Sequence, residues 1–178
     1  MTVGAAFQPI MDLRDMRVVG YEALARPADG TPPERLFAQA RAEGRLAELD
    51  RACRAAALRE AEAAGLDAPL SLFLNADAGA LELDLPELPS SGGAMLVIEI
   101  TESALTENPE SVLRTLTHLR LRGWGVSLDD VGADARSLAL MPLLYPDVIK
   151  LDLRLLSGGD EEHIARVVTA VGAEAERR

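Results

Sequence analysis

Cysteine is nearly absent from the sequence, because Cys53 is the only one among 178 residues and cannot form an intrachain disulfide. It lies in an alanine-rich helical pattern, which favours a small core or near-core position. Long apolar runs are missing as well: residues 94–98 form a stretch far shorter than the roughly 20 residues that span a bilayer. No basic region precedes an apolar core at the N-terminus. We therefore expect a cytoplasmic protein with no membrane segment in this chain.

Positive charge is also scarce, since 18 Lys and Arg residues stand against 29 Asp and Glu residues and give a net charge of -11. Such a surface repels polyanions, so DNA is not an expected partner, and an anionic ligand would need local positive charge. Metal ions could supply that charge. The remaining composition, with 48% hydrophobic and 26% charged residues, is typical of a soluble globular protein. We expect one domain over residues 1–178.

The sequence does contain a series of short apolar runs, mostly separated by helical sequence. Runs of this length, bounded by turn-forming or helical segments, are typical of buried strands. They predict six strands, at residues 6–10, 18–25, 70–75, 95–100, 125–129 and 148–153.

The intervening segments carry signals for the beginnings and ends of helices. Pro32 and Pro33 open one helix that Gly44 ends, and a longer helix ends at Gly65. A third helix begins at Asn108 as N-cap and ends at Gly123, and a fourth follows Asp160. Apolar residues at helical spacing mark the last two: Val112, Leu113, Leu116 and Leu119 in one, and Ile164, Val167, Val168 and Val171 in the other.

Strands separated by helices pair in parallel, and near-continuous apolar strands belong to a sheet that is covered on both faces. An open doubly wound sheet and a closed barrel both fit this pattern. The sequence has no Gly-x-Gly-x-x-Gly after the first strand and no phosphate-binding loop that ends in Gly-Lys-Ser/Thr. These absences favour an α/β fold of the TIM-type (β/α) barrel class.

Five of the predicted strands carry a polar residue near the C-terminal end. Alternate residues of a strand share a face, so Glu22 lies on the face of Leu24, and Lys150 on the face of Asp152. In a (β/α) barrel the C-terminal strand ends form the active-site face. The candidate site residues at these ends are Glu22, Asn75, Glu99, Asp129 and Lys150.

If the strand ends converge, several carboxylates share a small, partly desolvated space and repel one another unless cations lie between them. These carboxylates are Glu22, Glu99, Asp129, Asp130 and Asp152. Carboxylates with an asparagine carbonyl suit Mg²⁺, Mn²⁺ or Ca²⁺ better than structural zinc. A two-metal site would stabilise the oxygens of an in-line phosphoryl displacement, and Lys150 could hold the attacking water.

Five motifs, in this order and spacing, resemble those of the EAL domain family. The first is FQPIMDLRDMRVVGYEALARP, with Gln8, Pro9, the naming triad Glu22, Ala23 and Leu24, and Arg26. The others are LFLNA with Asn75, LVIEITES with Glu99 and Glu102, GVSLDDVG with Asp129 and Asp130, and DVIKLD with Lys150 and Asp152. The matching segments run from about Phe7 to the last helix.

The resemblance implies a TIM-type barrel that hydrolyses the bacterial second messenger cyclic di-GMP to linear pGpG with two Mg²⁺ or Mn²⁺ ions. It assigns metal binding to Glu22, Asn75, Glu99, Asp129 and Asp130, and catalysis to Glu22 and Lys150. Ligand contacts are expected from Gln8, Leu24, Arg26 and Asp152, with Arg26 near a phosphate. Besides cyclic di-GMP, the expected partners are a second copy in a homodimer and further signalling domains of the full-length protein.

The loop after the paired aspartates departs from the family pattern and leaves a second function open. The family usually has Phe-Gly-Thr-Gly, an aromatic residue and two serines there, whereas residues 131–137 read VGADARS. In the family this loop helps to order the second metal site and the dimer surface. The change supports an alternative, a catalytically degenerate EAL domain that acts as a cyclic di-GMP receptor or protein-interaction module.

The second departure concerns the last strands. The family continues with a seventh strand bearing a glutamate and an eighth with a glutamine, whereas this sequence ends at Arg178. We therefore expect an incomplete barrel of about six strands, as a fragment of a larger protein or completed by another chain. The 178 residues alone are expected to lack full activity. An unrelated metal-dependent barrel enzyme is a third, less favoured hypothesis.

Overall fold

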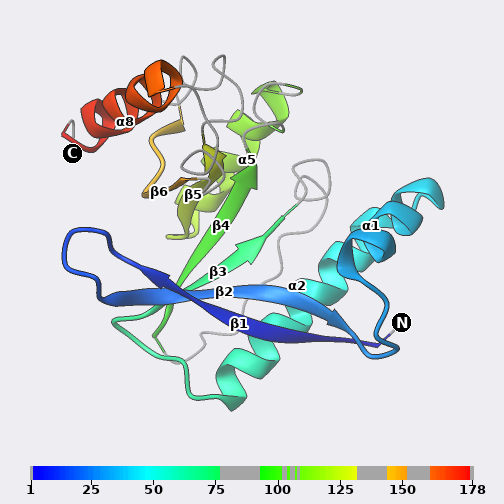
Figure 1. Cartoon of the computed structure of the whole chain (residues 1–178). Helices are drawn as coiled ribbons and strands as arrows, with labels where there is room; N and C mark the ends of the chain where they lie inside the picture. The colour runs from blue at the N-terminus through cyan, green and yellow to red at the C-terminus, as the bar shows by residue number, and fades with distance from the viewer. Residues whose placement is uncertain are drawn as a thin grey trace. The chain divides into compact units, whose positions relative to one another are not determined.

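The computed structural model of the chain describes residues 2–76, 93–101, 104, 107, 109–131, 144–151 and 161–176 (Figure 1). By its internal contacts the chain divides into two compact units, Met1–Ile98 and Glu99–Arg178. The boundary falls inside strand β4 (Met95–Thr101). Both units combine strands with helices, which confirms the predicted α/β class.

Six strands form one sheet in the order β1-β2-β3-β4-β5-β6, which is open at both ends among the described residues. Besides β4 they are β1 (Val3–Met11), β2 (Val18–Pro27), β3 (Ser71–Asn75), β5 (Gly125–Val131) and β6 (Val148–Leu151). Every predicted strand is confirmed, although β1 begins earlier than expected, and residues 152 and 153 lie outside the described part. As predicted, β2 pairs with β3 and β5 pairs with β6 in parallel.

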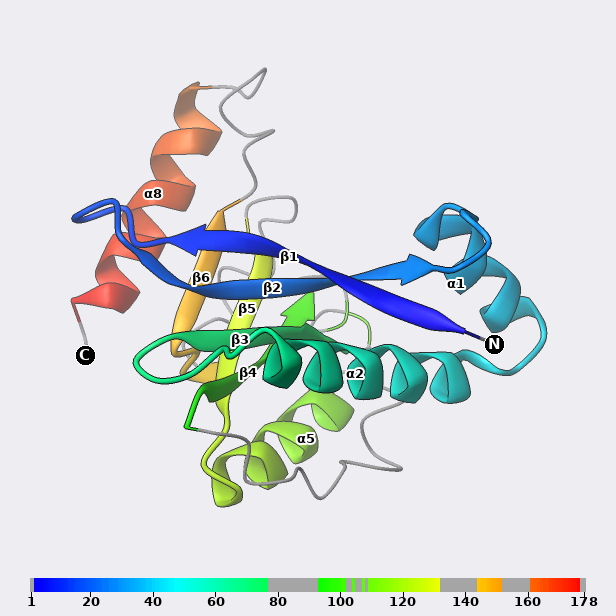
Figure 2. The ribbon, with the colours of Figure 1, turned by 90° about the horizontal axis from the view of Figure 1, so that it is seen from below.

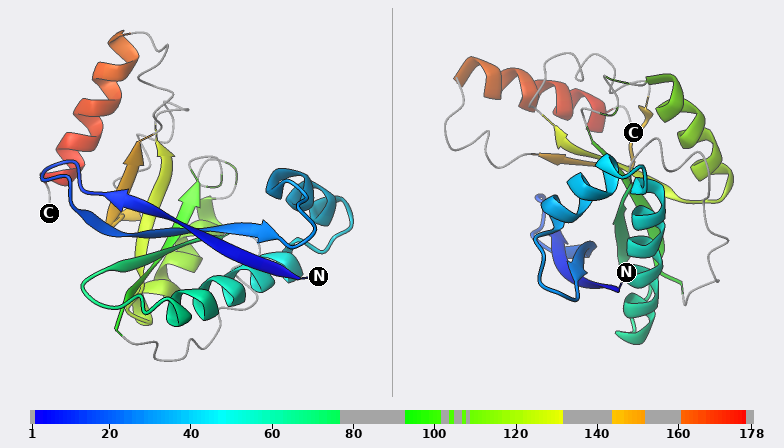
Figure 3. Two further views of the ribbon diagram at one scale, coloured as in Figure 1. Left: turned by 60° about the horizontal axis from the view of Figure 1, so that its bottom comes forward. Right: turned by 90° about the vertical axis from the view of Figure 1, so that its right-hand side faces the viewer.

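The first strand pair, β1 and β2, which no helix separates, runs antiparallel and lies outside the expectation of parallel pairing for helix-separated strands. Only residues 12–17 connect them, in a tight turn where the Asp12 amide donates to the Arg17 carbonyl at 2.9 Å and the Met16 amide to the Asp12 carbonyl at 2.8 Å. A parallel pair would need a crossover of about a dozen residues. The two strands form a long, twisted ribbon (Figure 3).

The helices are α1 (Pro33–Ala42), α2 (Leu46–Ala63), α5 (Pro109–Leu121) and α8 (Glu161–Ala175). Gly44, Gly65 and Gly123 follow the first three with φ of 68°, 71° and 73°. This left-handed conformation suits glycine and confirms the predicted helix ends. Asn108 and Asp160, which the sequence places at helix starts, lie outside the described residues. None of the described helices is long and apolar enough to cross a membrane.

In the first unit, α2 packs against β1, β2 and β3 (Figure 2). A small core there contains Val3 of β1, Leu36 and Ala40 of α1, and Leu49 of α2. Cys53 is partly buried against this core, which confirms its predicted near-core position. Burial raises the pKa of the Cys53 thiol to about 11.

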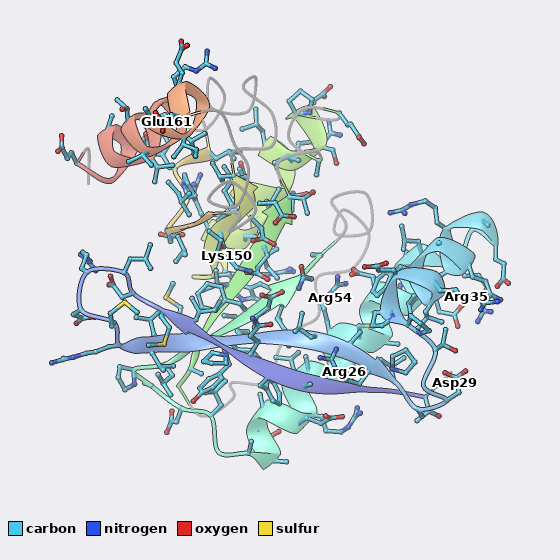
Figure 4. All side chains as sticks on the ribbon, in the orientation of Figure 1. Arg26, Asp29, Arg35, Arg54, Lys150 and Glu161 are labelled. Atoms are coloured by element: carbon cyan, nitrogen blue, oxygen red, sulfur yellow. The ribbon has the colours of Figure 1, made fainter. Side chains whose placement is uncertain are left out.

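Helix α2 also contains a buried ion pair that the sequence pattern did not indicate. Asp50 and Arg54 lie one turn apart, each is 3% exposed, and the Arg54 guanidinium donates to the Asp50 carboxylate (Figure 4). Breaking a buried pair leaves an uncompensated charge, which is strongly destabilising. The two residues are therefore expected to tolerate replacement only together.

In the second unit, α5 packs on β5, and its residues Val112 and Leu116 are buried. Leu113, which its spacing assigned to the same face, is 40% exposed, and Val168 of α8 is 55% exposed beside the buried Val167. Adjacent helical residues point about 100° apart, so one of each pair turns toward solvent. Leu113 and Val168 are therefore the solvent-facing members of the two sets of apolar residues at helical spacing.

Gly20 of β2 lies opposite Ser71 of β3, at a point where the two backbones approach closely. A Cβ at this position would lie 2.3 Å from the Ser71 carbonyl oxygen and 2.8 Å from Cε2 of Phe73. Both distances are well below the contact optimum for non-bonded atoms. Glycine therefore fixes how closely β2 passes β3, two residues before Glu22.

Replacing Gly20 by alanine is expected to lower the free energy of unfolding by about 1–3 kcal/mol, because a strand backbone must shift to admit the methyl group. Urea unfolding followed by circular dichroism measures the change. Gly172→Ala in α8 is the matched control, since among the described residues no atom outside its own helix backbone and chain neighbours lies within 4 Å of its added Cβ. There alanine should stabilise the helix by about 0.5–1 kcal/mol. Equal effects of the two substitutions would contradict the close approach at Gly20.

The raised pKa of Cys53 predicts slow alkylation of the folded chain. The reactive form is the thiolate, and a pKa of about 11 instead of 9.0 lowers its fraction at pH 8 by about 100-fold. The rate with iodoacetamide should rise until about pH 11 in the folded chain and level off near pH 9 in guanidinium. Because the folded-state pKa is the higher one, the free energy of unfolding is greatest below pH 9 and falls as the pH rises from 9 to 11, where the unfolded chain loses the thiol proton first. A plateau near pH 9 in the folded chain would argue against burial.

Candidate functional site

In the first unit, two predicted metal ligands meet at neighbouring strand ends. Asn75, the last residue of β3, donates from Nδ2 to Oε1 of Glu22 on β2 at 2.9 Å. In the parallel register Glu22 lies opposite Phe73, so Asn75 is two residues further along the same face. The bond engages the amide nitrogen of Asn75 rather than the carbonyl oxygen that a metal ion would bind.

Three predicted ligand contacts lie on the ribbon around Glu22. Gln8 is directly opposite Glu22 in the antiparallel register, so the two side chains share a face, and Gln8 is exposed. Leu24 lies two residues further along that face and is partly buried. Arg26 is four residues beyond Glu22, about 13 Å along the strand, and its Nη1 donates to the Ala25 carbonyl at 2.9 Å (Figure 4). The structure brings Gln8 beside Glu22 but leaves Arg26 apart from it.

In the second unit, Lys150 joins two predicted metal ligands (Figure 4). Its Nζ lies 2.6 Å from Oε1 of Glu99 and 3.2 Å from Oδ1 of Asp129. The Glu99 side chain is 0% exposed, against 20% for Lys150 and 18% for Asp129. A charge as deeply buried as that of Glu99 requires an opposite charge nearby, which Lys150 supplies. The three side chains meet on one face of their strands, as the alternation of strand residues predicted.

Strand β5 contains a bulge at the paired aspartates. Its register against β6 gains one residue between Leu128 and Val131, so Asp129 and Asp130 together lie opposite Lys150. Asp130 has a φ of 55°, a left-handed conformation that aspartate visits more readily than most residues. Bulges re-aim side chains and occur next to active sites. The sequence signal for this bulge is a pair of adjacent acids in a strand whose side chains otherwise alternate.

Some of the predicted site lies outside the part of the chain that the structure describes. This applies to Asp152, to Glu102 and to residues 132–137 of the altered loop. Their roles stay predictions.

Two clusters of side chains, Glu22 with Asn75 and Glu99 with Asp129 and Lys150, have oxygen donors that suit a hard divalent cation. Among their described residues the clusters offer carboxylate and amide oxygens, and no thiolate or imidazole. Within the described ranges, no three His, Cys, Asp or Glu side chains gather closely enough to hold one metal ion together. A metal role for these residues therefore rests on donor chemistry and not on an assembled coordination sphere.

Two proteins with similar sequences extend well beyond the length of this chain. YkuI of Bacillus subtilis, an uncharacterized EAL-domain containing protein, is 32% identical over 165 residues, which cover 84% of this chain and 40% of YkuI. NbdA of Pseudomonas aeruginosa, a cyclic di-GMP phosphodiesterase, is 35% identical over 163 residues, which cover 82% of this chain and 20% of NbdA. The chain thus spans less than half the length of either relative.

Solved structures share the fold. BlrP1 of Klebsiella pneumoniae, in a manganese and cyclic di-GMP complex, has a TM-score of 0.72 at 28% identity, with 90% of this chain and 42% of that chain covered. YkuI, in complex with cyclic di-GMP and calcium, has a TM-score of 0.69 at 26% identity, with 97% of this chain and 46% of that chain covered. The family profile described as EAL domain matches residues 2–176. Because this match extends over almost the whole sequence, the chain belongs to the EAL domain family.

Proposed function

We propose that this EAL domain hydrolyses one phosphodiester bond of cyclic di-GMP and releases linear pGpG. The observation that carries the proposal is the fully buried Glu99 carboxylate, held by Lys150 beside Asp129. A buried charge lowers stability, so its presence at a strand end favours a functional role. The relatives support the same function. The solved structures of BlrP1 and YkuI are complexes with cyclic di-GMP, and NbdA is a cyclic di-GMP phosphodiesterase.

In this proposal the metal ligands are Glu22, Asn75, Glu99, Asp129 and Asp130, which would hold Mg²⁺ or Mn²⁺. Such ions, when bound, acidify a water molecule and neutralise charge on the phosphate oxygens. The Lys150 ammonium, with its three N–H donors, orients the water oxygen toward phosphorus. The water releases one proton as its oxygen bonds to phosphorus, the bond from phosphorus to the ribose 3′ oxygen breaks, and that oxygen takes up one proton, so that protons balance.

We propose that side chains around the metal-binding residues contact cyclic di-GMP. Gln8, exposed opposite Glu22, can hydrogen-bond to the dinucleotide, and Leu24 offers an apolar contact on the same face. The exposed guanidinium of Arg26 suits a phosphate, which it can bind with two parallel hydrogen bonds. We also propose that Asp152 contacts the ligand. The same proposal includes a homodimer and further signalling domains in the full-length protein.

A second candidate function is a receptor that binds cyclic di-GMP without hydrolysing it. The observation that favours it is the sequence of residues 131–137, which departs from the family pattern directly after Asp129 and Asp130. A change at this place would affect the second metal ion more than the ligand contacts of the first unit. Equilibrium binding measured beside turnover distinguishes the two functions.

Glu22→Gln is expected to reduce turnover of cyclic di-GMP by more than about 100-fold, since losing residues that merely support metal ligands already costs about 10–100-fold. Turnover is measured with Mn²⁺ by chromatographic separation of pGpG from cyclic di-GMP. Glu48→Gln removes an exposed carboxylate of the same unit, paired with Arg45, and should keep full turnover. Binding without turnover, both in this chain and in a version extended by about 80 residues to typical barrel length, would contradict hydrolysis and favour the receptor. Absence of both would contradict both functions.

Asp130→Asn and Asp130→Gly test whether the second aspartate acts through its charge. Asparagine and glycine both tolerate the left-handed backbone, so each variant should unfold within about 0.5 kcal/mol of the unsubstituted chain. Turnover should nevertheless fall at least about tenfold in both, because each lacks the carboxylate. If either variant retained full turnover, Asp130 would be an exposed acid at the rim without a metal role. Urea unfolding and the pGpG assay provide the two readouts.

A further inference from the structure

Ser127 of β5 is a buried polar residue that the proposed reaction does not use. It is 0% exposed, and its Oγ has no hydrogen-bond partner among the described residues. Nearly all buried hydroxyl groups in native proteins have a partner, and ordered water often fills that role. The Ser127 hydroxyl is therefore expected to have a hydrogen-bond partner inside the second unit.

Ser127 shares a strand face with the side chains that meet in the second unit, those of Glu99, Asp129 and Lys150. It precedes Asp129 by two residues on the same strand face, and it is opposite Val148, which precedes Lys150 by two residues on β6. Lys150 contacts Glu99 and Asp129, which places all three on this face. On the other side β5 neighbours β4, whose Glu99 side chain is fully buried. Glu99 is thus the buried acceptor on the strand next to Ser127.

We propose that Ser127 is a positioning residue that holds the Glu99 carboxylate through one buried water. The Ser127 hydroxyl donates to the water, and the water donates to Glu99. Lys150 holds Oε1 of the same carboxylate from β6. With supports from two strands, the carboxylate keeps one orientation toward a divalent cation, so the inference rests on the proposed metal role of Glu99. Hydrogen-bonding residues that orient metal ligands typically change metal affinity by about 10–100-fold when removed.

The test measures Mn²⁺ affinity by isothermal titration calorimetry on the 178-residue chain. Ser127→Thr and Ser127→Val are a matched pair, because both side chains have the same shape and only threonine keeps the hydroxyl. Ser127→Val should bind Mn²⁺ about 10–100-fold more weakly than Ser127→Thr, and Ser127→Ala should show a similar loss relative to the unsubstituted chain.

Thr115→Val is the control for loss of a buried hydroxyl elsewhere. Thr115 is 2% exposed on α5, and its Oγ1 also has no hydrogen-bond partner among the described residues. Its removal should leave Mn²⁺ affinity unchanged. A loss as large as that of Ser127→Val would indicate a general effect on folding and would overturn the positioning role, as would equal affinities of Ser127→Thr and Ser127→Val.

If the unsubstituted chain binds no Mn²⁺, the proposed metal role of Glu99 fails. A high-resolution crystal structure of the chain then tests the contact between Ser127 and Glu99 separately. A water that bridges Ser127 Oγ and the Glu99 carboxylate supports the inference. A hydrogen bond from Ser127 Oγ to a backbone carbonyl overturns it.

Discussion

The charge of Glu99, buried without any exposure of its side chain, sets the condition that the second unit has to meet. An isolated carboxylate in such surroundings would be strongly disfavoured, so a cation must lie within contact distance. Lys150 satisfies this condition from β6 and contacts Asp129 of β5 as well. Residues from three successive strands are thereby linked at one point. The same contact gathers oxygen donors of the kind that a divalent metal ion binds.

The two units hold their strand-end carboxylates by different means. In the first unit an uncharged amide, that of Asn75, donates to Glu22, and both side chains remain at least partly accessible. In the second unit burial is deeper and a full positive charge is needed. Burial decides the difference, because bulk solvent screens and solvates Glu22, whereas the Glu99 side chain has no exposure to it. Each arrangement fixes the orientation of a carboxylate before any ligand arrives.

Local irregularities of the backbone place several of these side chains. The tight turn at residues 12–17 makes β2 the antiparallel partner of β1 and so sets Gln8 opposite Glu22. Gly20 allows β2 to pass close to β3 just before Glu22. In β5 the extra residue of the bulge sets Asp129 and Asp130 together opposite Lys150 in the register, and Asp129 contacts its Nζ.

The sequence by itself determined the strands, the helix ends at glycine, and the residue types at the strand ends, because these follow from local periodicity and backbone preferences. Its motifs also identified the EAL family, which the match over residues 2–176 confirms. Only the tertiary structure decided the pairing of Lys150 with Glu99 and the exposure of Leu113. These depend on contacts between residues far apart in the chain or on which side of a helix meets a neighbour. A one-dimensional pattern states which residues are apolar or charged, whereas register and burial are settled by what packs against them.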